Sequence, residues 1–131
     1  MCNVLPLTFD QPDLGTRIQA LDAAELDALD FGVIGMDAET LVRAYNTAES
    51  TLAGLGAGRV LGQPLFTSVA PCMNNFLVAQ RFEDAAASGV ALDATIDYVL
   101  TLRMRPLKVR LRLVAIPGAA LRYVLVYRRT G

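Results

Sequence analysis

The sequence predicts an α+β domain in which a five-stranded antiparallel sheet carries helices on one face and an N-terminal helical cap. The first observation is a change of period along the chain, because the segment 107–116 alternates apolar residues with Lys108, Arg110 and Arg112. Such alternation is typical of strands with one buried and one solvated face, and these strands pair antiparallel. The second observation is size: 131 residues, of which 53% are hydrophobic, can bury a core without disulfides or metal.

The N-terminal part of the chain predicts a helical cap followed by a β-hairpin. Apolar residues in 13–28 recur at helical spacing, which indicates one or two short helices, and we assign residues 1–28 to the cap. The apolar runs 31–37 and 41–46 are separated by a short polar segment, as in a hairpin. Residues 29–131 then form the core, and we expect the whole chain to be one domain.

Short helices precede three long strands in the rest of the chain. A short helix is expected to follow Asn46, its N-cap, and to end at Gly54 or Gly56. A single helical turn before Pro71 and a helix over 74–89 come next. The last elements expected are strands over 94–104, 107–116 and 122–129. Sensor domains of the PAS type have this order of elements. We find no internal repeat and no linker.

Charge and hydropathy exclude several kinds of partner. The net charge is −1, which gives no electrostatic reason to expect nucleic acid or an anionic membrane surface. The basic residues that cluster late in the chain, including Arg112, alternate with apolar ones and are predicted to lie on the solvated face of the sheet. No apolar run reaches the ~20 residues that span a bilayer, and the start lacks the features of a signal peptide, so we expect a cytoplasmic protein.

The chain contains no histidine, and this absence narrows the chemistry that it can perform. Ser-His and Cys-His nucleophile pairs and histidine-ligated metals are excluded, so we predict neither an enzyme nor a metal site. The glycine-rich segment 54–62 does not join a clear strand to a helix and is interpreted as a loop. Cys2 and Cys72 lie 70 positions apart, and this spacing indicates neither a disulfide framework nor a zinc site.

Three residues remain as candidates for a functional site: Tyr45, Glu49 and Cys72. Tyr45 and Glu49 are four residues apart where a strand gives way to a helix, so both side chains can point inward near the same spot. Each candidate also has an ordinary structural interpretation, as an edge-strand aromatic, a solvated helix residue or a packed thiol. Taken singly, none of them indicates chemistry.

The combination of these residues is more specific, and four stretches within 21–128 carry a resemblance: LDALDFGVIGMD, YNTAES, LGQPLFTSVAPC and MRPLKVRL. With them the chain resembles the photoactive yellow protein (xanthopsin) family, which it matches without a gap from Phe31 to Cys72. The resemblance implies a chromophore derived from p-coumaric acid, a p-coumaroyl (4-hydroxycinnamoyl) group held as a thioester by Cys72. It also implies that Tyr45 and a protonated Glu49 donate hydrogen bonds to the buried phenolate of this group.

The resemblance further implies a mechanism and the residues around the chromophore. Light would isomerise the double bond of the p-coumaroyl group, Glu49 would give its proton to the phenolate, and the cap of residues 1–28 would be released in a partly unfolded signalling state. The partner implied is a downstream signalling protein, or a fused kinase or bacteriophytochrome module. The chromophore-binding residues implied are Tyr45, Glu49, Ala53, Leu55, Val69, Ala70, Pro71 and Met104.

Two departures from the family pattern are expected to affect colour and cycle speed. Ala53 stands where well-known members have a threonine that supports the tyrosine, and Leu55 stands where they have an arginine. Either Leu55 covers the pocket, or Arg103 or Arg105 takes the place of that arginine. Three alternatives remain: a chromophore-free PAS module that binds a partner or a small molecule, a flavin-based light sensor, whose reactive cysteine motif is absent, and a thiol enzyme, which lacks a base.

Overall fold

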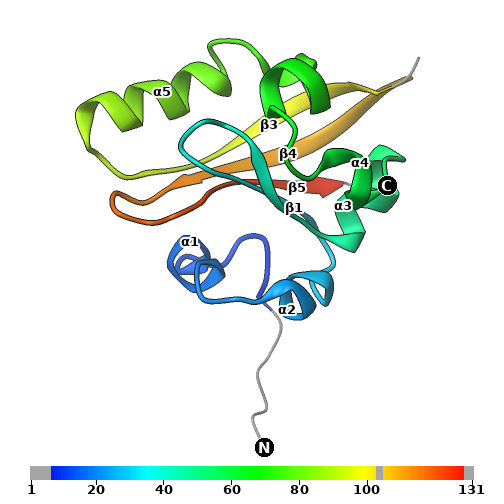
Figure 1. The fold of residues 1–131 in the computed structure, drawn as a ribbon, viewed down its shortest axis with the longest axis horizontal. Coiled ribbons are helices and arrows are strands. Elements are labelled where there is room, and N and C mark those ends of the chain that lie inside the picture. Colours follow the sequence, from blue (N-terminus) through cyan, green and yellow to red (C-terminus); the bar gives the residue numbers. More distant parts are fainter. Residues whose placement is uncertain (1–6, 103–104, 129–131) are drawn as a thin grey trace, which may run out of the picture.

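Five strands form one antiparallel sheet in the computed structural model, which describes residues 7–102 and 105–128 (Figure 1). The strands are β1 (Gly32–Met36), β2 (Val42–Tyr45), β3 (Leu92–Leu102), β4 (Arg105–Ala115) and β5 (Arg122–Arg128). Their order in the sheet is β2-β1-β5-β4-β3, so the first hairpin extends the sheet that the three C-terminal strands form. The predicted α+β class and the five antiparallel strands are confirmed.

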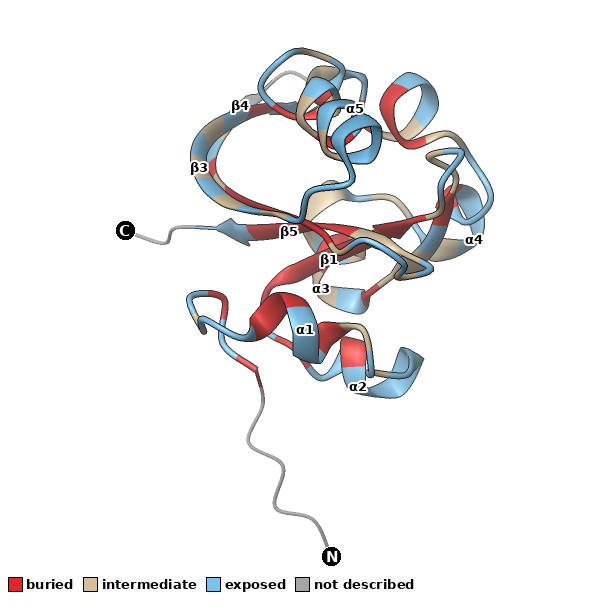
Figure 2. Cartoon of the chain, turned by 90° about the vertical axis from the view of Figure 1, so that its left-hand side faces the viewer, coloured by how far each residue is buried: buried red, intermediate tan, exposed pale blue. Residues whose placement is uncertain are grey.

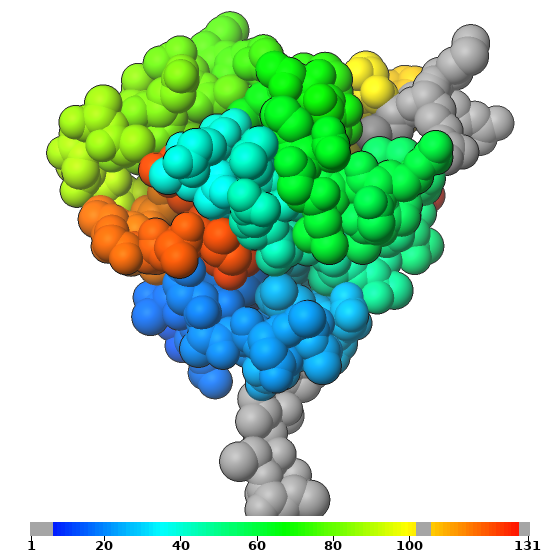
Figure 3. Space-filling view, viewed as in Figure 1, coloured from blue at the N-terminus to red at the C-terminus, as the bar shows by residue number. Residues whose placement is uncertain are grey.

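Helices cover both faces of this sheet. The cap consists of two short helices, α1 (Leu14–Ile18) and α2 (Ala23–Asp27), and it lies on one face (Figure 2). The helical elements on the other face are α3 (Thr47–Ala53), α4 (Ala57–Val60), a π-helical turn (Leu65–Val69), a 3-10 turn (Pro71–Met73) and α5 (Ala79–Ser88). In the space-filling view the cap, in blue, gathers along one side of the molecule, against the strands and α3 (Figure 3).

The sheet separates two hydrophobic clusters. The first joins the inner face of the sheet to the helices after β2, and Phe66, Phe82 and Leu111 are among its buried members. The second joins the cap to the outer face, where Leu14 packs in the same cluster as Leu125. Strand β1 is therefore buried along its whole length. The edge strand β3 alternates half-buried and exposed residues over 92–99, before the buried Leu100.

Arg112 corrects one expectation from the sequence, because it does not lie on a solvated face. Arg112 is 6% exposed, and its side chain pairs with Asp93, at 2.8 Å from Nε to Oδ1 and 2.9 Å from Nη2 to Oδ2. The same guanidinium donates to the carbonyl oxygens of Phe9, Gln11 and Pro12 at 2.9, 2.7 and 3.3 Å. The segment before α1 covers the polar face of β4 at Arg112, whereas Lys108 on the same face is exposed as predicted.

The first hairpin and the helix after it match the prediction. Strands β1 and β2 pair with Ile34 opposite Tyr45, and Asn46 caps α3 by accepting a hydrogen bond from the Glu49 amide at 3.0 Å. The helix ends at Gly54, whose φ of 70° is the left-handed conformation that glycine adopts readily. The junction between strand and helix thus fixes the positions of Tyr45 and Glu49.

The helix predicted over 74–89 is shorter at its start. It begins at Ala79, because the Asn75 side chain accepts hydrogen bonds from the amides of Leu77 and Val78 and holds the preceding segment in a turn. It ends as expected before Gly89, which has a φ of 70°. Among the described residues, no helix has the length and apolar character needed to cross a membrane.

Candidate functional site

Glu49 is a buried carboxylic acid in the first turn of α3. It is 4% exposed, and the N-cap at Asn46 sets the start of the helix so that this side chain turns toward β1. The carboxyl group lies directly over Gly32, where any Cβ would overlap Oε1 of Glu49. Burial raises the pKa of Glu49 to about 8. The acid is therefore protonated at neutral pH and has a proton to donate.

Tyr45 is the last residue of β2 and lies close enough to Glu49 to be affected by its charge. Burial, with a smaller contribution from the Glu49 charge, raises the pKa of Tyr45 to about 12. Its hydroxyl group and Oε1 of Glu49 are both buried, and neither has a hydrogen-bond partner within the described part of the chain. Buried polar atoms nearly always have a hydrogen-bond partner. Two that lack one at the same place are therefore suited to hydrogen-bond a polar group from outside the chain.

Cys72 lies in the 3-10 turn Pro71–Met73 and is half-buried. It packs against the same hydrophobic cluster as Tyr45. The structure thus places the thiol and the tyrosine around one core, between the sheet and the helices. The chain has no histidine, so the sulfur has no imidazole base beside it.

The other predicted site residues divide into three groups. Leu55 and Val69 are half-buried and pack against the core that Cys72 and Tyr45 also contact. Ala70 is buried at 8% exposure, Ala53 is half-buried at the end of α3, and Pro71 is exposed. Met104, Arg103 and the side chain of Arg105 lie outside the described residues, so their expected places near the chromophore stay predictions.

Two residues that sequence reasoning missed hold the Cys72 segment in place. The hydroxyl of Tyr98 donates a hydrogen bond to the carbonyl oxygen of Cys72 at 2.5 Å. Asn75 donates from Nδ2 to the same carbonyl at 3.2 Å and to the Tyr98 hydroxyl at 2.6 Å. The only sequence signal was a pair of asparagines after the cysteine, and nothing local connected them to a tyrosine on β3.

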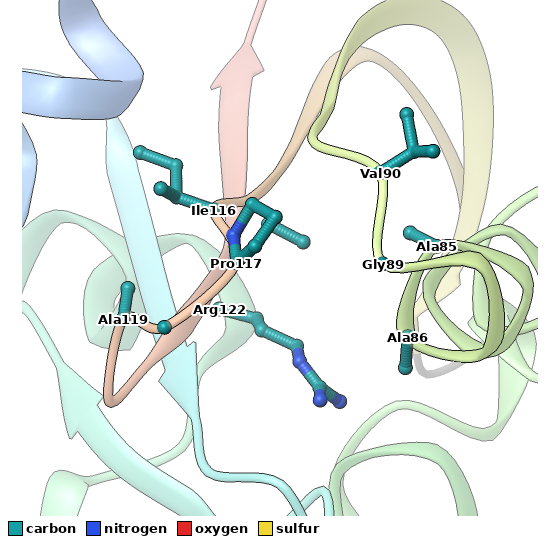
Figure 4. Close-up of a pocket in the computed structure, with 10 residues that line it drawn as sticks. Ala85, Ala86, Gly89, Val90, Ile116, Pro117, Ala119 and Arg122 are labelled. Carbon is teal, nitrogen blue, oxygen red and sulfur yellow. The ribbon is translucent and has the colours of Figure 1, made fainter.

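Two cavities of about 250 Å³ lie on the surface of the molecule, one of them beside Tyr45. One lies between the cap and β2, and Tyr45, Leu26 and Tyr123 are among the residues that line it. The other lies between the end of α5 and the turn from β4 to β5, and Arg122 points into it (Figure 4). None of the predicted site residues lines the second cavity, so it is separate from the candidate site.

The chain is similar in sequence to known proteins. The photoactive yellow protein of Rhodothalassium salexigens is 33% identical over 107 residues, which cover 82% of this chain and 85% of that protein. The chain belongs to the photoactive yellow protein family. A second relative, the photoactive yellow protein of Halochromatium salexigens, is 31% identical over 80% of this chain and 83% of its own length. No protein-family model matches the chain.

Solved structures place this family member in the PAS fold. The photoactive yellow protein domain of the sensor histidine kinase Ppr from Rhodospirillum centenum superposes with a TM-score of 0.79 and is 35% identical, over 87% of this chain and 99% of that domain. The PAS domain of nitrogen regulation protein NR(II) from Vibrio parahaemolyticus, at 17% identity and a TM-score of 0.57, shares the fold alone. It covers 84% of this chain and 99% of that one.

Proposed function

We propose that the chain is a blue-light photosensor that carries a p-coumaroyl group as a thioester on Cys72. The attachment forms a bond between the sulfur of Cys72 and the carbonyl carbon of an activated p-coumaroyl donor, with loss of the thiol proton and of the activating group. The observation that carries the proposal is the pair of buried, unpartnered polar atoms on Tyr45 and Glu49. A buried phenolate requires hydrogen-bond donors, and these two groups can supply them in a member of the photoactive yellow protein family.

The residues around the phenolate end would act as hydrogen-bond donors in the dark. When bound, the p-coumaroyl group supplies absorption of blue light and trans-to-cis isomerisation. Tyr45 keeps its hydroxyl proton because its pKa lies near 12, and Glu49 keeps its proton at neutral pH because its pKa lies near 8. Both can therefore donate charge-assisted hydrogen bonds, which are the strong kind.

Glu49 is also the proposed source of the proton that neutralises the phenolate after illumination. Once it has given up this proton, Glu49 is a carboxylate at 4% exposure with no described partner at Oε1. An unpaired buried charge costs several kcal/mol, which is a large part of the stability of a small domain. The lit state is therefore expected to loosen the fold near α3.

The cap is the element that this loosening would release. Asn46, the N-cap of α3, also donates from Nδ2 to the carbonyl of Leu26 in α2 at 2.9 Å. The amide of Thr47 donates to the side chain of Asp27 at 2.8 Å. A change at the start of α3 therefore acts on two bonds that hold α2. We propose cap release as the output, read by a kinase or another signalling module in the cytoplasm, by analogy with the histidine kinase that contains the similar domain.

Reconstitution in the dark tests the proposal. The purified chain is mixed with an activated p-coumaric acid, and the visible absorption is recorded before and after a blue flash. We expect a yellow protein that bleaches and recovers, a colourless Cys72→Ala variant, and a Cys2→Ala control that behaves like the unmodified sequence. A colourless wild-type chain would contradict the proposal and favour a PAS module that works without a chromophore.

A further inference from the structure

We propose that Asn75 and Tyr98 are positioning residues for Cys72, which hold its backbone carbonyl on β3 so that the thiol stands in a fixed place. The inference rests on the proposed function, because it concerns how the proposed thioester site is kept in position. Both residues bond the carbonyl oxygen of Cys72. Their effect is exerted through the main chain of the 3-10 turn that carries the cysteine.

The three groups form a closed triangle of hydrogen bonds. Tyr98 uses its single hydroxyl proton on the Cys72 carbonyl at 2.5 Å. Its oxygen accepts from Nδ2 of Asn75 at 2.6 Å, and the same Nδ2 also lies 3.2 Å from the Cys72 carbonyl oxygen, to which it donates. The carbonyl oxygen thus accepts two hydrogen bonds, which is its full capacity. Two side chains therefore hold the turn that carries Cys72.

The other end of Asn75 anchors the triangle to the helix that follows. Oδ1 accepts from the amides of Leu77 at 2.9 Å and Val78 at 3.2 Å. Val78 is fully buried in the core, and α5 begins directly after it. One amide side chain therefore connects the cysteine turn, the edge strand β3 and the start of α5.

This arrangement has a consequence for attachment of the chromophore. A short 3-10 turn has poor hydrogen-bond geometry of its own, so its position depends on outside contacts. The triangle supplies those contacts from residues that follow Cys72 by 3 and 26 positions. Breaking it should leave the thiol chemically intact but less well placed, which slows acylation and alters the environment of the thioester.

The first experiment measures the triangle directly, in the full chain without chromophore. The carbonyl of Cys72 is labelled with carbon-13, and its infrared stretching band is compared among wild type, Tyr98→Phe and Tyr127→Phe. Tyr127 is a matched control, because it is 40% exposed and stacks on Phe9 instead. We expect the band to move to higher frequency in Tyr98→Phe alone. An unchanged band in a folded Tyr98→Phe variant would overturn the inference whatever the chromophore does.

The second experiment measures the effect on attachment. Asn75→Asp keeps the acceptor oxygen for Leu77 and Val78 but loses the amide donor, and Asn74→Asp places the same charge on the exposed neighbour. With an activated p-coumaroyl donor, we expect Asn75→Asp and Tyr98→Phe to acylate roughly two- to tenfold more slowly, with a shifted absorption band, and Asn74→Asp to match wild type. Equal rates and bands in all four proteins would overturn positioning. Failure of wild type to acylate would instead overturn the proposed function, while the infrared result still decides the triangle.

Discussion

The proposed photochemistry depends on the carboxyl group of Glu49. Its protonation in the folded state makes the free energy of unfolding depend on pH, which can be measured. In the unfolded chain this acid titrates near its ordinary pKa of 4.5, and in the folded chain near 8. Between these values the folded state holds a proton that the unfolded state has lost. The free energy of unfolding must then fall as pH rises, by up to about 1.4 kcal/mol per pH unit, and become level above the folded pKa.

Replacement of this acid by an amide should remove that pH dependence. In the chain without chromophore, Glu49→Gln is expected to lose the decline between about pH 4.5 and pH 8 that the wild type shows. Urea unfolding at a series of pH values measures it. Glu83→Gln, which removes an exposed carboxyl group on α5, is the control and should keep the wild-type decline. Parallel curves for wild type and Glu49→Gln would show that Glu49 is not a buried neutral acid.

Asn46 is the residue that connects the site to the rest of the fold. It is 1% exposed, accepts from the amides of Val33 and Glu49, and donates to the carbonyls of Leu26 and Phe31. Asn46→Ala leaves buried groups unpaired and removes a helix cap, so it should cost at least about 2 kcal/mol of unfolding free energy. The exposed Asn74→Ala should cost less than about 0.5 kcal/mol. Similar urea midpoints for the two variants would contradict this account.

The sequence predicted those site residues whose relation is local. Tyr45 and Glu49 lie on either side of one strand-to-helix junction, so their spacing alone brings them to one place. The partners of Cys72 depend on how β3 passes the 3-10 turn, which no local pattern encodes, and so Tyr98 was missed. Gly32 carried a weak signal, since a glycine inside a strand often marks a close approach by another group.

At the scale of elements, Arg112 connects β4 to the segment before α1. It lies in the middle of a strand, yet its guanidinium satisfies three carbonyl oxygens of the cap and the carboxylate of Asp93. The period of β4 could not reveal this, because alternation shows only that two faces differ. Whether the polar face meets water or a distant segment depends on where that segment folds.

Loss of this connection should free the start of the cap. Arg112→Met is expected to cost about 3 kcal/mol, because it leaves buried carbonyls without donors, and to speed hydrogen exchange of the amides in 8–18. Arg110→Met is the matched variant on the same strand, since its pair with Asp97 is 3.5 Å long and the Asp97 side chain is 83% exposed. It should cost less than about 1 kcal/mol. Equal exchange rates in the two variants would show that Arg112 does not hold the cap.

At the scale of the whole molecule, the sheet depends on the cap to cover its outer face. Phe31, Val33 and Leu125 are each at most 2% exposed and belong to the cluster that the cap completes. The sequence predicted a cap at 1–28 but not which face it covers, because its helices are short and amphipathic packing alone fits either side. Its position follows from the second cluster, which only the folded chain assembles.

Deletion of residues 1–28 should therefore expose an apolar surface on an otherwise intact sheet. We expect the remaining chain, 29–131, to bind a hydrophobic dye and to self-associate, since exposed apolar patches of this kind promote association. Light scattering after size-exclusion chromatography measures the state. Deletion of residues 1–6, which stops before the buried Leu7, is the control and should leave a monomer. A monomeric 29–131 without dye binding would contradict the covering role of the cap.

The central claim for the whole molecule is that Cys72 carries a chromophore, and its intact mass tests this most directly. The chain is produced together with enzymes that make activated p-coumaric acid, and its mass is compared with that of Cys72→Ser from the same cells. We predict a gain of one p-coumaroyl group in the wild type, located on the peptide that contains Cys72, and an unmodified mass in the variant. An unmodified wild type, or an adduct that persists in Cys72→Ser, would contradict the claim.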